Sequence, residues 1–391
     1  MPLASAPYSF PELPRATFKG LPGLLADSLP DKFGNALIDA WLASQGRTPD
    51  TFNPVERLCY IGTRGMGALE FQPAILGTTN SRKRLEIDAL VRLANRVLDS
   101  RIALQGKFCG ADDTAVIEDI IRVGTSAGGA RAKAILAWNE ATGEFRSGQV
   151  PAGQGFTHWL MKFDGVSGNR DKELADPQGY GIVEFAYHRM ALAAGIDMME
   201  CRLHRENGRA HFMTKRFDRL KNGEKIHAQS LCAMMHFDFN LPDAYSYEQA
   251  LGVIRRLSMP TAAVEQQYRR AVFNVIGRNH DDHVKNIAYL MNKQGEWTLS
   301  PAFDIAYSYN PTGAWTSRHQ MSINGKRDGF ELEDLLALAR AGDIKRRRAL
   351  AIAEEVDAAV GGWPTFAAEA GVPDGMAARI ASTQRRLAAL V

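Results

Sequence analysis

The sequence predicts an α+β protein in which a mixed α/β amino-terminal part precedes a mainly helical carboxy-terminal part. Short apolar runs at 157–165 and 210–220 have the length and composition of strands. After about residue 221 the apolar residues recur at helical spacing instead, as they do in 262–276. Because 391 residues can bury more than one core, we expect the two parts to form separate lobes.

The chain divides into three predicted segments. Residues 1–105 form an accessory region with a Pro/Gly-rich entry, residues 106–220 complete the first lobe, and residues 221–391 form the helical lobe. Before residue 221 we expect helices at 36–46, 84–99 and 181–196 and strands at 67–71, 157–165 and 210–220. In the last segment we expect helices at 227–235, 247–257, 262–276, 344–360 and 376–391.

The composition is that of a globular protein without a dominant charge. Forty-seven basic and 44 acidic residues leave a net charge of +3, which is too balanced to predict extended nucleic-acid binding. The four cysteines lack C-x-x-C spacing, so the sequence indicates neither a zinc site nor a disulfide framework and favours a reducing cytoplasm. We expect no secretory signal at the amino terminus and no membrane-spanning segment, which would need about 20 apolar residues.

Two acids and an amide are spaced as phosphoryl transfer requires. Asp281 and Asn286 are five positions apart, and Asp304 follows two predicted strands, 287–291 and 297–300. In protein kinases one Asp orients the attacking hydroxyl, an Asn five positions later holds magnesium, and a second Asp beyond a hairpin holds magnesium against the phosphates. Asp and Asn are also ordinary turn residues, but the predicted hairpin would return Asp304 toward Asp281.

A glycine-rich stretch upstream is a candidate phosphate-binding loop. Residues 122–133 read RVGTSAGGARAK, in which Gly124, Gly128 and Gly129 permit positive backbone angles and close approach. Successive amide groups in such a loop can converge on phosphate oxygens. Glycine-rich turns are common, however, and the stretch matches neither a Walker A nor a G-x-G-x-x-G pattern.

Three further features follow in the order found in kinases. Lys162 lies in the predicted strand at 157–165, where it either faces solvent or reaches the α- and β-phosphates. Glu184 lies in the first turn of the helix at 181–196, where it either pairs with Lys162 or only complements the helix dipole. The backbone of Lys215–Phe217 is a candidate adenine contact at the link between the lobes.

These segments together resemble a known family. GTSAGGARAK, KFD, the Glu184 helix, KRFDR, NHDDHVKN and SPAFDI are similar to the HipA family of serine/threonine-protein kinase toxins from bacterial toxin–antitoxin modules. The resemblance covers roughly residues 20–330 in unbroken order. It implies a protein-kinase-like fold of two lobes with ATP and Mg²⁺ between them, in which residues 106–220 are the nucleotide-clamping part of the first lobe.

The resemblance also implies a role for each site residue. Asp281, His283 and Lys285 are expected in the catalytic loop, and Asn286 and Asp304 are expected to bind magnesium. The expected ATP-binding residues are Gly124, Thr125, Ser126, Gly128, Gly129, Lys162, Glu184, Lys215 and Phe217. Ser126 is the expected autophosphorylation site, with Thr125 as the second choice, and its phosphorylation is expected to eject the loop and switch the kinase off.

The sequence departs from the family at its amino terminus. The family's first strands usually precede the LPDKFG-type segment, which here begins at Leu29. A separate small polypeptide could supply that piece and cover Leu21, Leu24, Leu25 and Trp41, or these side chains could pack internally on the helix at 84–99.

The expected function is a Mg-ATP-dependent serine/threonine kinase toxin that arrests growth and is regulated by a helix-turn-helix antitoxin. DNA would be bound only through the antitoxin, and the favoured substrate is an aminoacyl-tRNA synthetase. The segment after Asp304 carries Tyr307, Tyr309 and Trp315, which either form a platform for a protein substrate or pack on the catalytic loop. The alternatives are a small-molecule kinase and a nucleotide-binding scaffold in an antitoxin–DNA complex.

Overall fold

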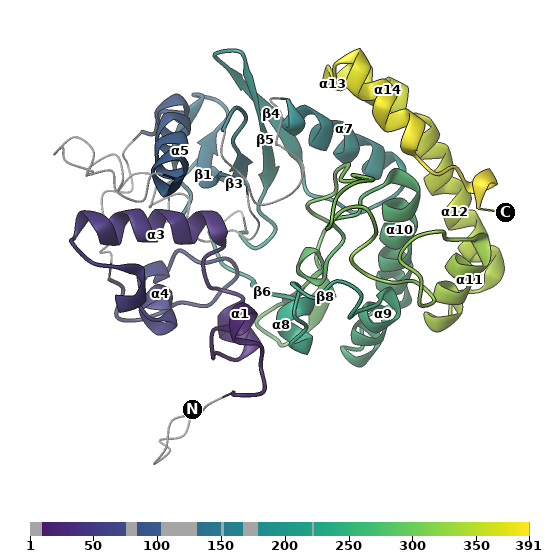
Figure 1. The fold of residues 1–391 in the computed structure, drawn as a ribbon, viewed down its shortest axis with the longest axis horizontal. Coiled ribbons are helices and arrows are strands. Elements are labelled where there is room, and N and C mark those ends of the chain that lie inside the picture. Colours follow the sequence, from purple (N-terminus) through teal and green to yellow (C-terminus); the bar gives the residue numbers. More distant parts are fainter. Residues whose placement is uncertain are drawn as a thin grey trace.

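The computed structural model has two lobes, as the sequence predicts. The described residues are 10–75, 84–102, 131–149, 152–166, 179–220 and 223–390. Helices and strands mix in the amino-terminal lobe, whereas the carboxy-terminal lobe is mainly helical (Figure 1). The α+β fold class is therefore confirmed.

A five-stranded antiparallel sheet is the centre of the first lobe. Its strand order is β2-β1-β3-β5-β4. The strands are β1 (Lys133–Asn139), β2 (Glu144–Ser147), β3 (Thr157–Lys162), β4 (Cys201–Glu206) and β5 (Arg209–Lys215). β3 and β5 confirm the strands expected at 157–165 and 210–220.

The two faces of this sheet have different neighbours. Trp159 and Met161 of β3 belong to a core cluster that also contains apolar residues of α3 (Lys32–Ser44) and α5 (Ile87–Ile102). Because strand side chains alternate between faces, Lys162 faces away from that cluster. The helix α7 (Tyr180–Ala193) contacts β4 and β5 and carries the predicted Glu184.

The accessory region is helical where the structure describes it. Its elements are α1 (Arg15–Phe18), α2 (Gly23–Ala26), α3, the 3-10 turn η1 (Pro49–Thr51), α4 (Pro54–Ile61) and α5. The helices expected at 36–46 and 84–99 are thus confirmed as α3 and α5. Trp41 packs on Tyr60, with ring centroids 4.9 Å apart, and Leu21 packs against the core of the second lobe, whereas Leu24 is 41% exposed.

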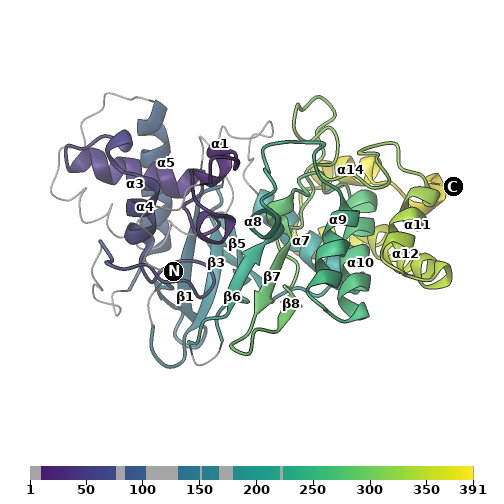
Figure 2. The ribbon, with the colours of Figure 1, turned by 90° about the horizontal axis from the view of Figure 1, so that it is seen from below.

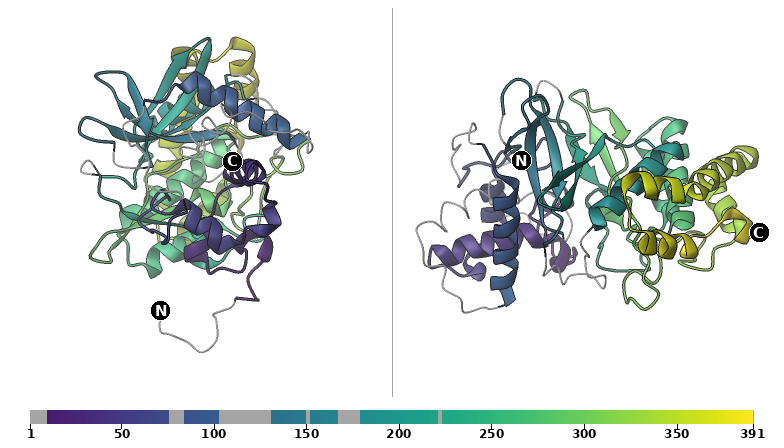
Figure 3. Two further views of the ribbon diagram at one scale, coloured as in Figure 1. Left: turned by 90° about the vertical axis from the view of Figure 1, so that its left-hand side faces the viewer. Right: turned by 90° about the horizontal axis from the view of Figure 1, so that it is seen from above.

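The second lobe combines a small sheet with a helical bundle. The sheet has the order β6-β7-β8 and lies between the first sheet and α9 and α10 (Figure 2). Its strands are β6 (His227–Ser230), β7 (Ala288–Met291) and β8 (Trp297–Leu299). The helices are α8 (Leu231–Met235), α9 (Tyr247–Arg256), α10 (Thr261–Gly277), α11 (Leu332–Ala341), α12 (Arg346–Gly361), α13 (Trp363–Ala370) and α14 (Asp374–Thr383), with 3-10 turns η2 (Val284–Asn286) and η3 (Leu387–Ala389). Figure 3 shows α13 and α14 at the end of the molecule opposite α3.

The strand expected at 67–71 is wrong. These residues form turns and bends, because side chains of the link between the lobes bind their backbone groups. The Gly67 N–H donates to Asp218 Oδ2 at 2.6 Å, and the Arg219 guanidinium donates to the Gly67 carbonyl at 3.0 Å. Gly67 has φ 73°, which also excludes a regular strand.

Two expected helices are shorter than the sequence predicts. Residues 227–230 form β6, because they pair with β7 from His227↔Met291 to Ser230↔Ala288, and the helix begins only at Leu231. At the carboxy terminus α14 ends at Thr383, because the Arg385 N–H donates to the Ile276 carbonyl at 3.0 Å. That contact draws the following residues out of helical geometry.

Within the described residues, no helix has the combined length and apolar character needed to cross a membrane. Cys59, Cys201 and Cys232 are free thiols, and Cys109 lies outside the described residues.

Candidate active site

A buried charge cluster joins the two lobes at Lys162. The Lys162 Nζ donates to Glu184 Oε1 at 2.6 Å and to Asp304 Oδ1 at 2.5 Å. Glu184 is on α7 and its side chain is 3% exposed, whereas Asp304 belongs to the second lobe and is 36% exposed. The pairing of Lys162 with Glu184 that the sequence suggested is therefore present. The same Lys162 ammonium also donates to the Asp304 carboxylate.

The groups of this cluster shift one another's pKa, and burial raises the pKa of Glu184 despite the nearby Lys162 and Arg131. Burial alone would lower the pKa of Lys162, but the Asp304 and Glu184 carboxylates outweigh it and raise the pKa above its ordinary value. Lys162 is therefore protonated at neutral pH, and its ammonium lies between Glu184 of the first lobe and Asp304 of the second. A fixed cation of this kind is what the phosphates of a nucleotide require.

Arg131 is a member of the cluster that the sequence did not single out. Its Nη1 donates to Glu184 Oε2 at 3.2 Å, and its guanidinium lies 5.1 Å from the centroid of the Tyr180 ring. Arg131 directly follows the glycine-rich residues in the chain. Glu184 therefore accepts hydrogen bonds from two cations of the first lobe.

The glycine-rich loop lies outside the described residues. The predicted phosphate-binding and phosphoacceptor residues there are Gly124, Thr125, Ser126, Gly128 and Gly129. Their roles remain predictions.

The predicted catalytic loop follows α10 directly. Arg278 ends that helix in a left-handed conformation with φ 60°, and its N–H donates to the Asn274 carbonyl. The Asn286 Nδ2 donates to the Asp281 carbonyl at 2.8 Å, so the two predicted residues are in direct contact. The Asp281 Oδ1 accepts a hydrogen bond from Trp315 Nε1 at 3.0 Å.

The other two predicted loop residues lie around Asp281. The His283 Nε2 is 3.9 Å from Asp281 Oδ1. The Lys285 Nζ lies 4.6 Å from the centroid of the Phe239 ring. Both side chains are therefore close to the loop, and Lys285 contacts an aromatic face of the second lobe.

One pocket is lined both by residues of the predicted catalytic loop and by Asp304. Its lining consists of Tyr247, Gln267, Arg270, Asn274, Asn279, Asp282, His283, Asn286, Ile287, Ala302, Phe303, Asp304 and Ile305. The Asp304 carboxylate and the Asn286 amide oxygen are hard ligands of the kind that Mg²⁺ accepts. The described residues hold no group of three or more His, Cys, Asp or Glu side chains that could bind a metal by themselves. A site of one carboxylate and one amide suits a magnesium ion that also binds phosphate oxygens.

Two backbone amides of the link between the lobes already have partners within the protein, so the predicted adenine contact at Lys215–Phe217 stays a prediction. The Lys215 N–H donates to the Glu200 carbonyl at 2.9 Å, and the Arg216 N–H donates to the His158 carbonyl at 2.9 Å. These two amides are therefore engaged within the protein. The Phe217 ring lies 5.6 Å from the Phe303 ring, which precedes Asp304 and lines the pocket.

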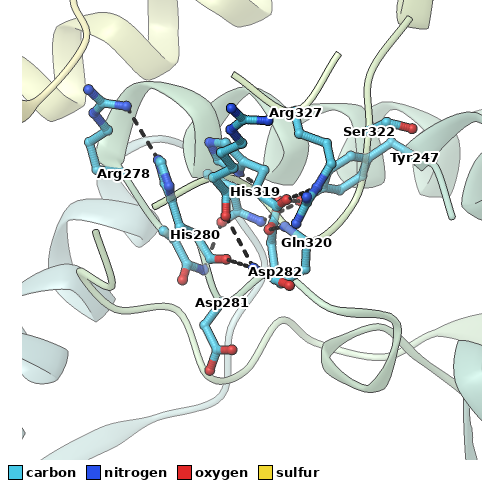
Figure 4. A network of polar contacts seen from close by, with 12 residues as sticks. Tyr247, Arg278, His280, Asp281, Asp282, His319, Gln320, Ser322 and Arg327 are labelled. Atoms are coloured by element: carbon cyan, nitrogen blue, oxygen red, sulfur yellow. Dashed lines mark hydrogen bonds and ion pairs between the residues drawn. The ribbon is translucent and has the colours of Figure 1, made fainter. Parts of the chain in front are cut away.

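Asp282 is a further residue that sequence reasoning missed. Its carboxylate accepts hydrogen bonds from Tyr247 Oη at 2.7 Å, from His319 Nδ1 at 2.8 Å and from the Gln320 N–H at 2.7 Å (Figure 4). Figure 4 also shows the Asp281 carboxylate pointing away from this network. The adjacent acids of the DDHVKN motif therefore differ, with one directed outward and the other buried.

Of the aromatic residues after Asp304, Tyr307 is buried, whereas Tyr309 and Trp315 are partly buried. Tyr307 is buried and its hydroxyl is 3.1 Å from Thr383 Oγ1, and the Tyr309 ring lies 4.2 Å from the Arg278 guanidinium. Trp315 contacts Asp281 as described above. The Trp315 contact is with the predicted catalytic loop, which favours packing on that loop over an open platform for this residue.

Comparison with known proteins places the whole arrangement in a family. Residues 125–363 match the family model described as the HipA-like C-terminal domain, and residues 1–72 match the HipA N-terminal domain. The second match covers the region in which the sequence predicted missing strands. In its described part, residues 10–72, the structure has helices and no strand.

Two solved structures show how far the fold is shared. HipA of Shewanella oneidensis MR-1, solved with HipB and operator DNA, has a TM-score of 0.62 and 18% identity, over 92% of this chain and 82% of that one. The Helicobacter pylori proinflammatory kinase CtkA has a TM-score of only 0.34 and 12% identity, over 57% of this chain and 92% of that one. The first match shows a shared HipA fold, and the second is too distant to support an inference.

A curated relative matches part of the chain. It is Putative kinase Y4mE of Sinorhizobium fredii, which is 24% identical over 196 residues. The alignment spans 47% of this chain and 39% of the relative's length.

Proposed function

The chain belongs to the HipA family, and on that premise we propose that it is a Mg-ATP-dependent serine/threonine protein kinase that acts as a toxin. The observation that carries the proposal is Lys162, whose ammonium joins Glu184 of the first lobe to Asp304 of the second. In protein kinases a strand lysine paired with a helix glutamate contacts the phosphates, and a second aspartate holds magnesium.

Each polar residue of the site has a proposed role. Lys162 would contact the α- and β-phosphates, and Asp304 with Asn286 would hold magnesium, which would neutralise charge on the phosphates. Asp281 would orient the hydroxyl of the protein substrate and accept its proton. The hydrogen bond from Trp315 Nε1 supports this role, because it fixes the direction of the Asp281 carboxylate.

The proposed regulation depends on the glycine-rich loop. Ser126, or else Thr125, would receive a phosphate from the bound nucleotide. The added charge of about −1.5 to −2 would displace the loop and lower the affinity for ATP. Arg131 supports this link, because it joins the residues after the loop to Glu184.

The proposed partners follow from the family. We propose a helix-turn-helix antitoxin that carries this chain to DNA, since the Shewanella oneidensis HipA was solved with HipB and operator DNA. The proposed substrate is a cytoplasmic translation protein, with an aminoacyl-tRNA synthetase favoured. A separate small polypeptide that covers residues 10–29 stays a prediction, because a single exposed leucine such as Leu24 is ordinary on a protein surface.

The kinase proposal is tested by magnesium-dependent ATP turnover. Asp304→Asn should reduce turnover by a factor of at least about 10³, because it removes a charged metal ligand and a partner of Lys162. Asp374→Asn, which changes an acid in the first turn of α14, is the matched control and should keep full activity. Full turnover by folded Asp304→Asn protein would refute the assignment of the site.

A further inference from the structure

A continuous chain of hydrogen bonds lies behind the catalytic loop. It begins at the backbone of Asp281, whose N–H donates to Ser308 Oγ at 2.9 Å. The Ser308 hydroxyl in turn donates to Asn279 Oδ1 at 2.9 Å. Ser308 therefore uses its one hydroxyl both as acceptor and as donor.

The chain continues through α10 and α9 and returns to the loop. The Asn279 Nδ2 donates to Asn274 Oδ1 at 3.0 Å, and the Asn274 Nδ2 donates to Tyr247 Oη at 2.9 Å. The Tyr247 hydroxyl donates to Asp282 Oδ2 at 2.7 Å. Because Asp281 and Asp282 are neighbours in sequence, the hydrogen bonds and one stretch of backbone form a closed ring.

Every bond of the ring runs in the same direction. Each side chain accepts from the residue before it and donates to the residue after it, and the last acceptor is a carboxylate. Consecutive hydrogen bonds of this kind polarise one another, and a charged group at the last acceptor strengthens each of them. The five side chains are each less than one-tenth exposed, so water competes weakly for their hydrogen bonds; they are Tyr247, Asn274, Asn279, Asp282 and Ser308.

The terminal acceptor is itself held in place. His319 Nδ1 and the Gln320 N–H also donate to the Asp282 carboxylate. Burial alone would raise the pKa of Asp282, but contact with His319 and the hydrogen bonds of its neighbours lower it below the ordinary value. Asp282 is thus an ionised anchor for the ring.

The ring connects the parts of the molecule that a phosphoryl transfer must align. Tyr247 belongs to α9, Asn274 to the last turns of α10, and Ser308 to the segment that follows Asp304. The Ser308 N–H also donates to the Arg278 carbonyl at 3.2 Å, which ties that segment to the end of α10. The Asp281 backbone and the Asp304 segment are therefore fixed to the same two helices.

We propose that Tyr247, Asn274, Asn279 and Ser308 are positioning residues, which hold the Asp281 backbone in the orientation that directs its carboxylate outward. They act through Asp281, whose backbone N–H is the first donor of the ring. This inference rests on the proposed phosphoryl transfer, because the orientation of Asp281 matters to a reaction that uses it.

The test opens the ring at two separate points. Tyr247→Phe removes one hydroxyl and leaves Asp282 with His319 and Gln320, so the fold should persist. Ser308→Ala removes the acceptor of the Asp281 N–H. The matched controls are Tyr289→Phe, whose buried hydroxyl donates to the Ala250 carbonyl at 3.5 Å, and Ser322→Ala, whose hydroxyl donates to the Tyr245 carbonyl at 3.4 Å.

We expect each ring variant to lower kcat by about tenfold to a hundredfold, because small displacements of reacting groups have effects of that size. The KM for ATP should change less than kcat, since Lys162 and Asp304, the charged groups proposed to hold the nucleotide and its metal, are unaltered. The double variant should lose no more than the worse single variant, because the ring is already open. Controls should keep the wild-type kcat.

Amide hydrogen exchange supplies a readout that does not need activity. Peptides covering 279–283 should exchange faster in both ring variants than in the wild type and the controls. Unchanged kcat and unchanged exchange in folded ring variants, or losses that add in the double variant, would overturn the inference. If the wild-type protein shows no phosphoryl transfer, the proposed kinase function is refuted instead. The exchange rates of peptides 279–283 would still test whether the hydrogen-bond ring holds the Asp281 backbone.

Discussion

Replacing Lys162 with Met separates the structural role of the charge cluster from its catalytic role. Lys162 and Arg131 carry two positive charges against the two negative charges of Glu184 and Asp304. Met keeps much of the apolar stem of the lysine and removes the ammonium. The variant therefore leaves one uncompensated negative charge beside Glu184, whose side chain is only 3% exposed.

The expected loss of stability follows from this geometry. Removing one partner of a fully buried ion pair costs about 3–5 kcal/mol. Here Arg131 still contacts Glu184, and Asp304 is 36% exposed, so we expect a loss of about 2 kcal/mol in the free energy of unfolding. The loss of a preorganised donor to the phosphates should lower kcat by about 10²–10³.

A second substitution distinguishes the two effects. Lys162→Met/Glu184→Gln restores the charge balance, so it should be more stable than the sum of the single variants predicts, yet it should stay inactive. Chemical denaturation and ATP turnover measure both quantities, with Lys293→Met, at a side chain 74% exposed, as the control. A Lys162→Met protein with wild-type turnover, or stability losses that simply add, would refute the reasoning.

Other predictions concern the loop, acid stability and growth. Incubation with Mg-ATP should add phosphate to Ser126 or Thr125, which peptide mapping detects, and phosphate found only outside 122–133 would contradict self-inhibition. Asp218 is fully buried, which alone would raise its pKa, but contacts with Arg216 and Arg219 lower the pKa to about 2. Because the unfolded value is about 3.9, this group should contribute about 2–3 kcal/mol of stability above pH 4, lost as the pH falls toward 2. Asp218→Asn should therefore be less stable at neutral pH and less sensitive to acid, and an unchanged acid transition would contradict this. Expression should arrest growth and raise uncharged tRNA of one type, and arrest with every tRNA normally charged would exclude the synthetase.

The parts of the site that the sequence predicted are those whose signal is local. The spacing of Asp281 and Asn286 is a property of one loop, and their contact follows from it. Lys162 in the middle of a short strand and Glu184 near the start of the following helix made their pairing one of two open interpretations, and the structure contains the pair. Such features depend on the backbone within a few residues.

The parts that the sequence did not predict depend on long-range contacts. Arg131 meets Glu184, and Asp282 meets Tyr247 and His319, only because separate elements converge in the fold. Nothing in the residues around these side chains distinguishes them from ordinary surface charges. The sequence could have suggested Asp282 through its place in DDHVKN, but not that it is the buried acid of the two.

Long-range contacts also explain two places where the predicted secondary structure was wrong, the strand at 67–71 and the end of the last helix. The stretch at 67–71 alternates like a strand, but Asp218 and Arg219 bind its backbone. The last helix ends early, because Arg386 pairs with Asp357 at 2.7 Å while the Arg385 N–H donates to α10. In each place tertiary hydrogen bonds override local propensity.

The most direct test of the central claim is phosphoproteomics of cells that express the chain, compared with cells that express Asp281→Gln. The account predicts phosphoserine or phosphothreonine on a cytoplasmic translation protein and in the glycine-rich loop with the wild-type chain only. Gln retains the size and hydrogen-bonding capacity of the side chain but cannot accept the proton of the substrate hydroxyl. The same new phosphosites in both cultures, or none in either, would contradict the proposed protein kinase.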